Sequence, residues 1–215
     1  MSKNTLLIFD IDGTLTDTVN MYHEIFNETL LELGFQNFNS NFNEYKHHTD
    51  SFVVNEINRN QRDTEQKQDI ISMFEKLILE KIKLKKIYEI KGAKKTIEIL
   101  SKSENISICY ATGSVFQTAK YKLESIGINF TLDQLACSNV NEERENILKE
   151  AIKKAQKKKN ISRFERIISV GDGIWDLKTA QNLKLDFVGI GNKNREILNE
   201  NGMINWFENL TNFSI

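Results

Sequence analysis

Proline is absent from this chain of 215 residues, and cysteine occurs only twice. Because proline often marks where helices begin and end, the boundaries of elements have to be predicted here from glycine, asparagine and charge. The two cysteines, Cys109 and Cys137, lie in apolar stretches without the spacing of a metal or disulfide motif. Their scarcity excludes a disulfide-stapled scaffold and indicates reduced core thiols in a cytoplasmic protein.

The chain also lacks an excess of one charge and any long apolar run. Lys and Arg number 29 against 30 Asp and Glu, a net charge of −1, whereas a protein that wraps nucleic acid usually carries a large basic excess. No apolar run approaches the roughly 20 residues that cross a bilayer. The apolar stretch Leu6–Phe9 is far too short for a secretory signal. We therefore expect a cytoplasmic protein with neither a nucleic-acid partner nor a membrane partner.

What the sequence does contain is a succession of helix and strand patterns. An apolar run at Thr5–Phe9 predicts a buried strand, and the helical spacing of apolar residues predicts helices at 19–33, 51–58 and 69–87. Beyond these, helices are expected at 93–101, 117–126, 144–158 and 176–183, and strands at 106–111, 135–137, 167–170 and 187–190. Such alternation is typical of a parallel sheet covered by helices on both faces.

The stretch from Asp17 to about Ile87 differs from the rest because it contains helical patterns and no convincing strand. We therefore predict an α/β protein with a Rossmann-like parallel sheet core, formed by residues 1–16 and 88–215. A second, smaller all-helical cap domain, residues 17–87, is expected as an insertion after the first strand.

Polar side chains follow three of the predicted strands at the point where each strand ends. They are Asp10 and Asp12, then Thr112 and Gly113, and finally Asp172 and Asp176. Ligands of open parallel sheets bind at the carboxyl ends of the strands, so these groups should converge on one crevice. Asp10 and Asp12 would point to the same side of an extended chain and repel each other without a cation. Four carboxylates in one crevice predict a site for a hard ion, and Mg²⁺ fits best.

These segments resemble the motifs of the haloacid dehalogenase-like (HAD) hydrolase superfamily. DIDGTLT at Asp10–Thr16, after the strand TLLIF, resembles the first motif, and Thr112-Gly113, after ISICYA, is similar to the second. GDGIWD at Gly171–Asp176, after IISV, resembles the fourth. The position and helical character of the insertion resemble the caps of the phosphoglycolate phosphatase and β-phosphoglucomutase branch.

The resemblance implies a role for each residue of these motifs. Asp10 would be the nucleophile that takes up the phosphoryl group, and Asp12 the general acid and then the general base. Asp172 would bind Mg²⁺ directly, with Asp176 binding the metal or orienting its waters, and Asp12 would give the ion its backbone carbonyl. Thr112 would bond a phosphoryl oxygen through its hydroxyl, with the N–H of Gly113 beside it.

The third motif of the superfamily is a basic residue, usually Lys, at the start of the helix before the fourth strand. The chain has no Lys-Pro there, and Arg144 is the best positional candidate for the phosphate contact. Arginine can clamp a phosphate with two hydrogen bonds. Lys149 is the weaker candidate, and the alternative for Arg144 is a surface charge paired with neighbouring glutamates.

The expected function is a Mg²⁺-dependent phosphomonoester hydrolase acting on a small phosphorylated metabolite. A phosphomutase of the same superfamily is the alternative within enzymes, and a catalytically silent protein that binds a phosphorylated ligand is the alternative outside them. A dehalogenase is disfavoured because members with that activity lack the second aspartate, which Asp12 supplies here. His47 and His48, in the predicted cap, either read the substrate or belong to a solvated loop.

Overall fold

The computed structural model describes residues 4–61 and 67–215, so parts of the predicted segments 1–16 and 17–87 lie outside the described residues. Its strands form a single sheet in the order β3-β2-β1-β4-β5-β6, with every neighbouring pair parallel. The strands are β1 (Thr5–Phe9), β2 (Ile106–Ala111), β3 (Leu135–Ala136), β4 (Arg166–Gly171), β5 (Asp186–Ile190) and β6 (Asn205–Phe207). The predicted α/β class with a Rossmann-like parallel sheet is therefore confirmed.

The α-helices follow the order that the sequence patterns predict, with one addition. The α-helices are α1 (Val19–Glu32), α2 (Asp50–Gln61), α3 (Lys67–Ile82), α4 (Ala93–Leu100), α5 (Phe116–Ser125), α6 (Arg144–Lys159), α7 (Ile174–Asn182) and α8 (Arg195–Glu200). Short 3-10 turns are η1 (Phe42–Glu44), η2 (Leu132–Gln134) and η3 (Leu210–Asn212). Helix α8 and strand β6 had not been predicted.

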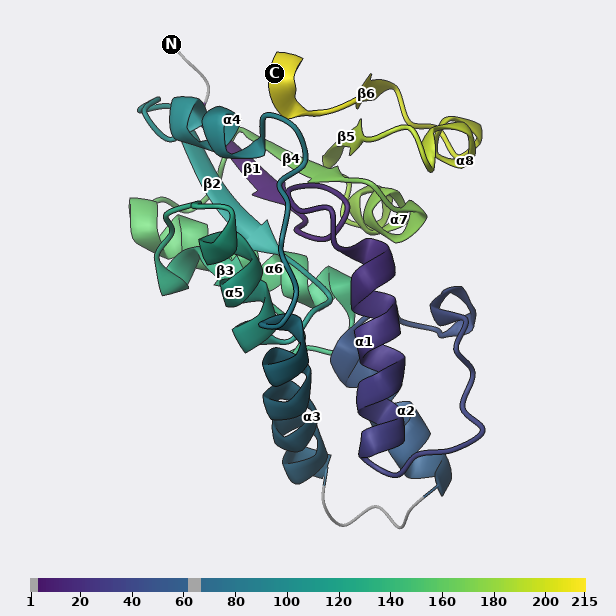
Figure 1. Cartoon of the computed structure of the whole chain (residues 1–215). Helices are drawn as coiled ribbons and strands as arrows, with labels where there is room; N and C mark the ends of the chain where they lie inside the picture. The colour runs from purple at the N-terminus through teal and green to yellow at the C-terminus, as the bar shows by residue number, and fades with distance from the viewer. Residues whose placement is uncertain (1–3, 62–66) are drawn as a thin grey trace.

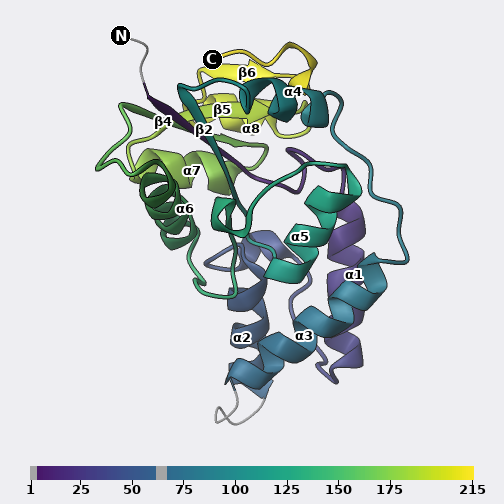
Figure 2. The same ribbon diagram turned by 90° about the vertical axis from the view of Figure 1, so that its left-hand side faces the viewer.

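The alternating side chains of β1 explain why helices cover both faces of the sheet. Leu6 and Ile8 pack with apolar residues of α6, while Leu7 and Phe9 pack on the opposite side with residues of α4 and α5. All four side chains are buried, and burial of such a side chain contributes about 1.5–3 kcal/mol. Figure 2 shows α6 and α7 on one side of the strands and α4 on the other.

Helices α1, α2 and α3 lie together at one end of the sheet, where they form a bundle that we call the helical insert (Figure 1). Phe26 of α1 and Phe74 of α3 meet at its centre, with ring centroids 4.8 Å apart. The sequence pattern predicted a helix as far as residue 87, but α3 ends at Ile82. The chain turns after it, and Leu84 is 85% exposed, so the apolar periodicity no longer follows a buried face.

Two chain segments connect the sheet to the helical insert, and they are hydrogen-bonded to each other. The N–H of Asp17 donates to the carbonyl of Tyr88 at 2.9 Å, and the N–H of Ile90 donates to the carbonyl of Leu15 at 2.8 Å. Thr16 and Glu89 form an antiparallel bridge between these bonds. The insert is thus attached to the sheet through a short, paired connection.

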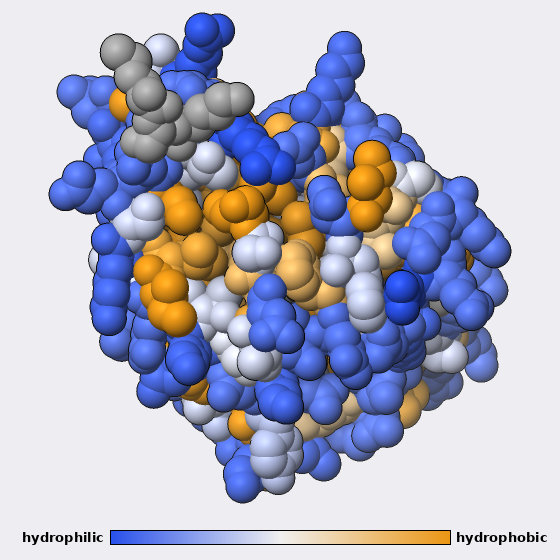
Figure 3. All heavy atoms as spheres, turned by 90° about the horizontal axis from the view of Figure 1, so that it is seen from above, coloured by the Kyte–Doolittle hydropathy of each residue, from blue (hydrophilic) through white to orange (hydrophobic). Residues whose placement is uncertain are grey.

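The surface of the protein is predominantly polar. Figure 3, which looks down on the end of the molecule opposite the helical insert, shows an apolar area surrounded by polar side chains. None of the helices in the described part of the chain is both long and apolar enough to cross a membrane.

Candidate active site

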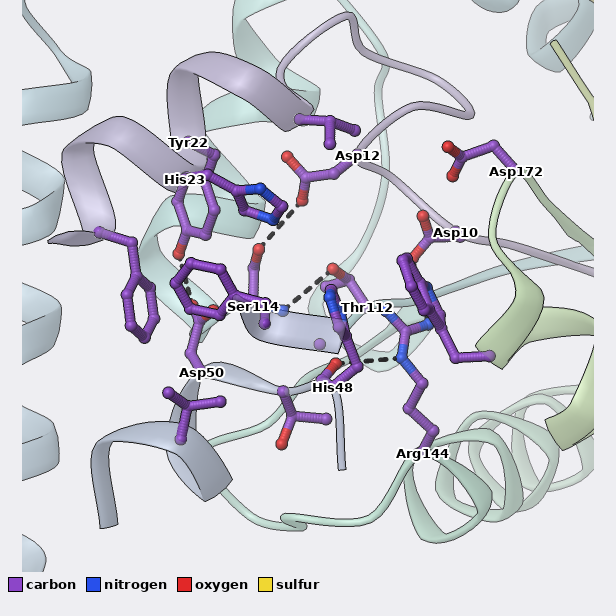
Figure 4. A pocket seen from close by; sticks show the side chains of 17 residues that line it. Asp10, Asp12, Tyr22, His23, His48, Asp50, Thr112, Ser114, Arg144 and Asp172 are labelled. Carbon is purple, nitrogen blue, oxygen red and sulfur yellow. Dashed lines mark hydrogen bonds and ion pairs between the residues drawn. The ribbon is translucent and has the colours of Figure 1, made fainter. Parts of the chain in front are cut away.

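The pocket that carries the predicted site lies where β1, β2 and β4 end, facing the helical insert (Figure 4). The register pairs Phe9 with Tyr110 on one side and with Val170 on the other, so the three strands end level with one another. As a result, Asp10, Thr112 and Asp172 all line this pocket, which encloses about 570 Å³ of empty space including its open mouth.

Two glycines allow the loops of the site to approach each other closely. Gly13 has a φ of +81°, and a Cβ there would lie 2.3 Å from an Oδ of Asp172. A Cβ on Gly113 would lie 2.6 Å from the carbonyl oxygen of His48. Any larger residue would push the loop after β1 away from the loop after β4, or the loop after β2 away from the helical insert.

Three carboxylates form a cluster at the sheet end of the pocket. Oxygens of Asp10, Asp172 and Asp176 all lie within 4.8 Å of one another, and Asp10 and Asp176 are buried. Burial and the charge of Asp176 raise the pKa of Asp10 well above its usual range, and the same two causes raise the pKa of Asp172 to about 8. Oδ1 of Asp10 has no hydrogen-bond partner. Such a cluster of oxygen donors fits a hard divalent cation.

Arg144 connects this cluster to the helical insert. It is the first residue of α6, and its side chain is 11% exposed. One Nη forms an ion pair with Asp176 and lies 3.8 Å from Oδ1 of Asp10, while Nε donates to the carbonyl of His48 at 3.1 Å. Lys149, the other candidate, is exposed on the same helix and does not line the pocket.

Asp12 has a different set of partners, centred on a lysine that the sequence reading did not single out. The side chain of Lys122 on α5 is fully buried, and its Nζ lies 2.7 Å and 2.8 Å from the two carboxylate oxygens of Asp12. The hydroxyls of Thr18 and Ser114 also donate to Asp12. Burial alone would raise the pKa of Asp12, but Lys122 and these hydrogen bonds outweigh burial and lower it.

Lys122 also contacts the helical insert. Its Nζ lies 3.3 Å from the centroid of the Tyr22 ring, and the hydroxyl of Tyr22 donates to Asp50 at the start of α2. Asp50 accepts a second hydrogen bond, at 2.9 Å, from the N–H of Val115 at the start of α5. Burial raises the pKa of Asp50 to about 7. The network therefore links Asp12 to two helices of the insert.

Aromatic rings form much of the remaining wall. The ring of His48 stacks on Trp175 with centroids 3.8 Å apart, and the ring of His23 stacks on Phe42 at 4.6 Å. Burial and the charge of Arg144 lower the pKa of His48 to about 3, so its ring is neutral. His47 lies outside the pocket, where it faces Glu143 and packs against Phe52.

The structure thus brings the residues of the three strand-end motifs, Arg144 and His48 together. Sequence reasoning missed Lys122, Tyr22 and His23. The available signal for Lys122 was its position on α5, one turn after Thr118 and directly before Leu123, both of which are buried. A lysine on the inner face of a helix needs a buried counter-charge, but the sequence does not identify Asp12 as that partner.

A comparison with protein families identifies a match that covers most of the chain. The family described as haloacid dehalogenase-like hydrolase matches residues 7–190, a range that includes the three strand-end motifs and Arg144. No curated protein matches the sequence.

Solved structures of similar fold cover nearly the whole chain. A hydrolase from Pseudomonas syringae is 23% identical with a TM-score of 0.73, over 96% of this chain and 94% of that one. CbbY from Rhodobacter sphaeroides, a D10N mutant in complex with xylulose-(1,5)bisphosphate, is 15% identical with a TM-score of 0.75, over 98% and 96%. A protein from Bacteroides vulgatus assigned as a β-phosphoglucomutase is 16% identical with a TM-score of 0.69, over 97% and 85%. At these identities the likeness establishes the fold.

Proposed function

Because the chain belongs to the haloacid dehalogenase-like hydrolases, we propose that it is a Mg²⁺-dependent phosphomonoester hydrolase of the cytoplasm, acting on a small phosphorylated metabolite. The observation that carries this proposal is the pair Asp10 and Asp12. Both open on one pocket, but the pKa of Asp10 is raised and that of Asp12 is lowered. A bound cation would relieve the repulsion that raises the pKa of Asp10, so Asp10 suits a metal-bound nucleophile, whereas Asp12 lies outside the carboxylate cluster and suits a separate acid–base group.

Asp10 is the proposed nucleophile. Its Oδ1 has no hydrogen-bond partner and lies at the pocket wall, 3.8 Å from a guanidinium nitrogen of Arg144. A lone pair of this oxygen attacks phosphorus and forms an aspartyl-phosphate, while the bond from phosphorus to the alcohol oxygen breaks. Asp12 protonates the departing alcohol oxygen.

Water completes the turnover. Asp12, ionised beside Lys122, takes a proton from a water molecule, whose oxygen attacks phosphorus and displaces the carboxylate of Asp10. Inorganic phosphate leaves, and Asp12 keeps the proton that it donates to the next leaving alcohol. Protons and charges therefore balance over one cycle without another co-reactant.

Mg²⁺ fits the carboxylate cluster, because Asp10, Asp172 and Asp176 offer closely spaced oxygens. The negative charges of these groups repel one another, and the pKa of each carboxyl group is raised. Asp10 and Asp172 would hold the ion with the backbone carbonyl of Asp12, and Asp176 would bind it or its waters. When bound, the ion offsets the repulsion between the anionic nucleophile and the anionic phosphate.

Thr112, Gly113 and Arg144 are the proposed phosphate ligands. Thr112 is buried at the end of β2, and its Oγ1 accepts from the N–H of Ser114 at 3.1 Å, which fixes the turn. Arg144 lies beside Gly113, with a nitrogen 3.3 Å from where a Cβ of that glycine would be. Donors fixed in this way stabilise the charge on the transferring phosphoryl oxygens.

The helical insert, residues 17–87, is proposed to be a separate cap domain that supplies the far wall of the pocket. Val19, Phe26, Phe42 and Val53 of the insert line that wall.

Phosphate release from a panel of phosphorylated sugars, nucleotides and short acids tests the proposal. Turnover should require Mg²⁺ and disappear in the Asp10→Asn variant. If no member of the panel releases phosphate with folded, Mg²⁺-supplied enzyme, the proposed activity is wrong.

A further inference from the structure

The wall of the pocket that the helical insert contributes is rich in aromatic and aliphatic side chains, with Thr49 and Asp50 as its other members. The helical insert contributes it through α1, η1 and α2, and Phe26 and Phe42 meet there edge to face with centroids 4.7 Å apart. The stacked pair His23–Phe42 adds flat ring faces to this wall, and His48 stacks on Trp175 of α7, next to the carboxylate cluster. In Figure 4 the rings of Tyr22 and His23 lie on the far side of the pocket from Asp172.

Positive charge in this pocket is confined to the place where the transferred phosphate binds. Among the described residues that line it, Arg144 is the only cation, and it already contacts Asp176 and Asp10. Lys122 is buried behind Asp12 and is not part of the lining. Lys193, whose side chain contacts Asn20, is exposed and also outside the lining.

The other groups of the wall do not supply a second anion site either. Burial lowers the pKa of both His23 and His48, which leaves their rings neutral. Asp50 brings a carboxyl group to the same wall, and Asp12 also lines the pocket. A second anionic group on the substrate would be buried among rings and carboxyl groups without a cationic partner, which is unfavourable.

We propose that the substrate is the phosphomonoester of a compact, uncharged apolar or aromatic alcohol, in which the transferred phosphoryl group is the only anion. This inference rests on the proposed function. It excludes bisphosphates and phosphorylated carboxylic acids as preferred substrates, since each carries a second anion that the aromatic wall cannot bind.

Three benzyl phosphates of similar size test the inference: the unsubstituted ester and its 4-hydroxymethyl and 4-carboxy derivatives. We expect kcat/KM to fall by about tenfold or more for the carboxy derivative, because a buried charge without a partner is costly. The kcat/KM of the hydroxymethyl derivative should fall much less, which separates the effect of charge from the effect of size. A kcat/KM for the carboxy derivative, or for a hexose bisphosphate, that equals or exceeds that of benzyl phosphate would overturn the inference.

Binding provides a readout that does not depend on turnover. Calorimetry with the Asp10→Asn variant and Mg²⁺ should show tighter binding of benzylphosphonate than of 4-carboxybenzylphosphonate. If none of the esters is hydrolysed but this order of binding holds, the proposed hydrolysis is wrong and the ligand class stands. If the esters are hydrolysed and the order is reversed, the hydrolysis stands and the ligand class is wrong.

A gain of charge in the wall provides the converse test. Val19 is half-buried at the first position of α1 and lines the pocket. Val19→Lys should raise the kcat/KM of the carboxy derivative relative to benzyl phosphate. Leu31→Lys is the matched control, because Leu31 is 59% exposed on the same helix and outside the pocket lining. If both variants change the ratio equally, a local charge in the wall does not set specificity.

Discussion

Asp10 and Asp12 are the same amino acid on the same loop, but their surroundings differ. Asp10 lies with Asp172 and Asp176, and burial among like charges raises its pKa. Asp12 is held by Lys122, Ser114 and Thr18, and its pKa is lowered despite burial. The comparison shows how a protein can give two neighbouring carboxyl groups different chemistry. Asp10 lacks sufficient cationic partners and is suited to bind a metal and a phosphate, while Asp12 is already paired with a lysine.

Replacing Asp10 should have the largest effect on activity. Asp10→Asn keeps the shape of the side chain but removes the nucleophilic carboxylate, so turnover should be abolished. Because the change also removes one of three mutually repelling carboxyl groups, the melting temperature without metal should not fall. Activity within about tenfold of wild type in the folded variant would exclude Asp10 as the nucleophile, since removal of a covalent nucleophile typically costs far more.

Removing the metal should abolish activity just as completely in the unaltered protein. Excess chelator should stop phosphate release, Mg²⁺ should restore it, and Ca²⁺ should inhibit because it prefers more ligands and looser geometry. Since the pKa of Asp172 is raised to about 8, Mg²⁺ must displace protons at neutral pH. Calorimetry should therefore show proton release on binding, and affinity should increase as the pH rises from about 6 to about 8. Full activity in chelator would contradict the metal site.

Loss of Arg144 tests the cationic side of the Asp10 cluster. Arg144→Ala should lower kcat about 10²-fold, as removal of a fixed electrostatic donor typically does, and KM should change less. Arg144→Lys should recover part of the loss because it restores the charge but not the planar fork. Lys149→Ala on the same helix is the control. If Lys149→Ala is the damaging change and Arg144→Ala is nearly silent, the phosphate-binding role belongs to Lys149.

Loss of Lys122 should have a smaller effect on catalysis. It should raise the pKa of Asp12, so that both aspartates have raised pKa values. In Lys122→Met, burial is no longer opposed by the lysine, so the pKa of Asp12 should rise and the acidic limb of the kcat profile should move to higher pH. Lys122→Arg should keep the limb near its original position. Lys120→Met, which removes a half-exposed lysine of α5, should leave the profile unchanged. An unmoved limb in folded Lys122→Met would show that Lys122 does not control Asp12.

The melting temperature of Lys122→Met should also change with pH in a defined direction. The pKa of Asp12 is lower in the folded protein than in the unfolded chain, so its ion pair with Lys122 stabilises the fold at pH values above the unfolded-state pKa. This stabilisation is lost as the pH falls through the folded-state pKa of Asp12. Leaving one member of a buried pair alone typically costs about 3–5 kcal/mol. The melting temperature of Lys122→Met should therefore fall at neutral pH, and the deficit should shrink toward pH values near 4 as Asp12 takes up a proton.

The surroundings of Asp10 could be predicted from the sequence, but the pairing of Asp12 with Lys122 could not. Asp10, Thr112 and Asp172 each follow an apolar run, and the geometry of a parallel sheet brings such positions together without further information. Lys122 meets Asp12 across 110 positions because α5 packs beside the loop after β1, a tertiary contact that has no local signature. The order of the helices was also predictable, because the apolar periodicity that indicates each helix lies within the segment that forms it.

The elements that had not been predicted are short and depend on their neighbours. Strand β6 has three residues, Asn205–Phe207, and becomes a strand by pairing with β5. Helix α8 has six residues and buries one side chain, Leu198, so its apolar pattern is too brief to predict a helix. The end of α3 at Ile82 is likewise set by the turn that leads the chain back to the sheet.

The paired connection between the sheet and the helical insert has a mechanical consequence. Asp17 is tied to Tyr88, and Ile90 is tied to Leu15, by backbone hydrogen bonds on both sides of the Thr16–Glu89 bridge. Two strands of chain joined in this way bend together more easily than they slide or twist apart, because sliding breaks the bonds and bending does not. The connection therefore restricts bending of the insert to one axis, and it holds the wall that the insert contributes in a defined position relative to Asp10.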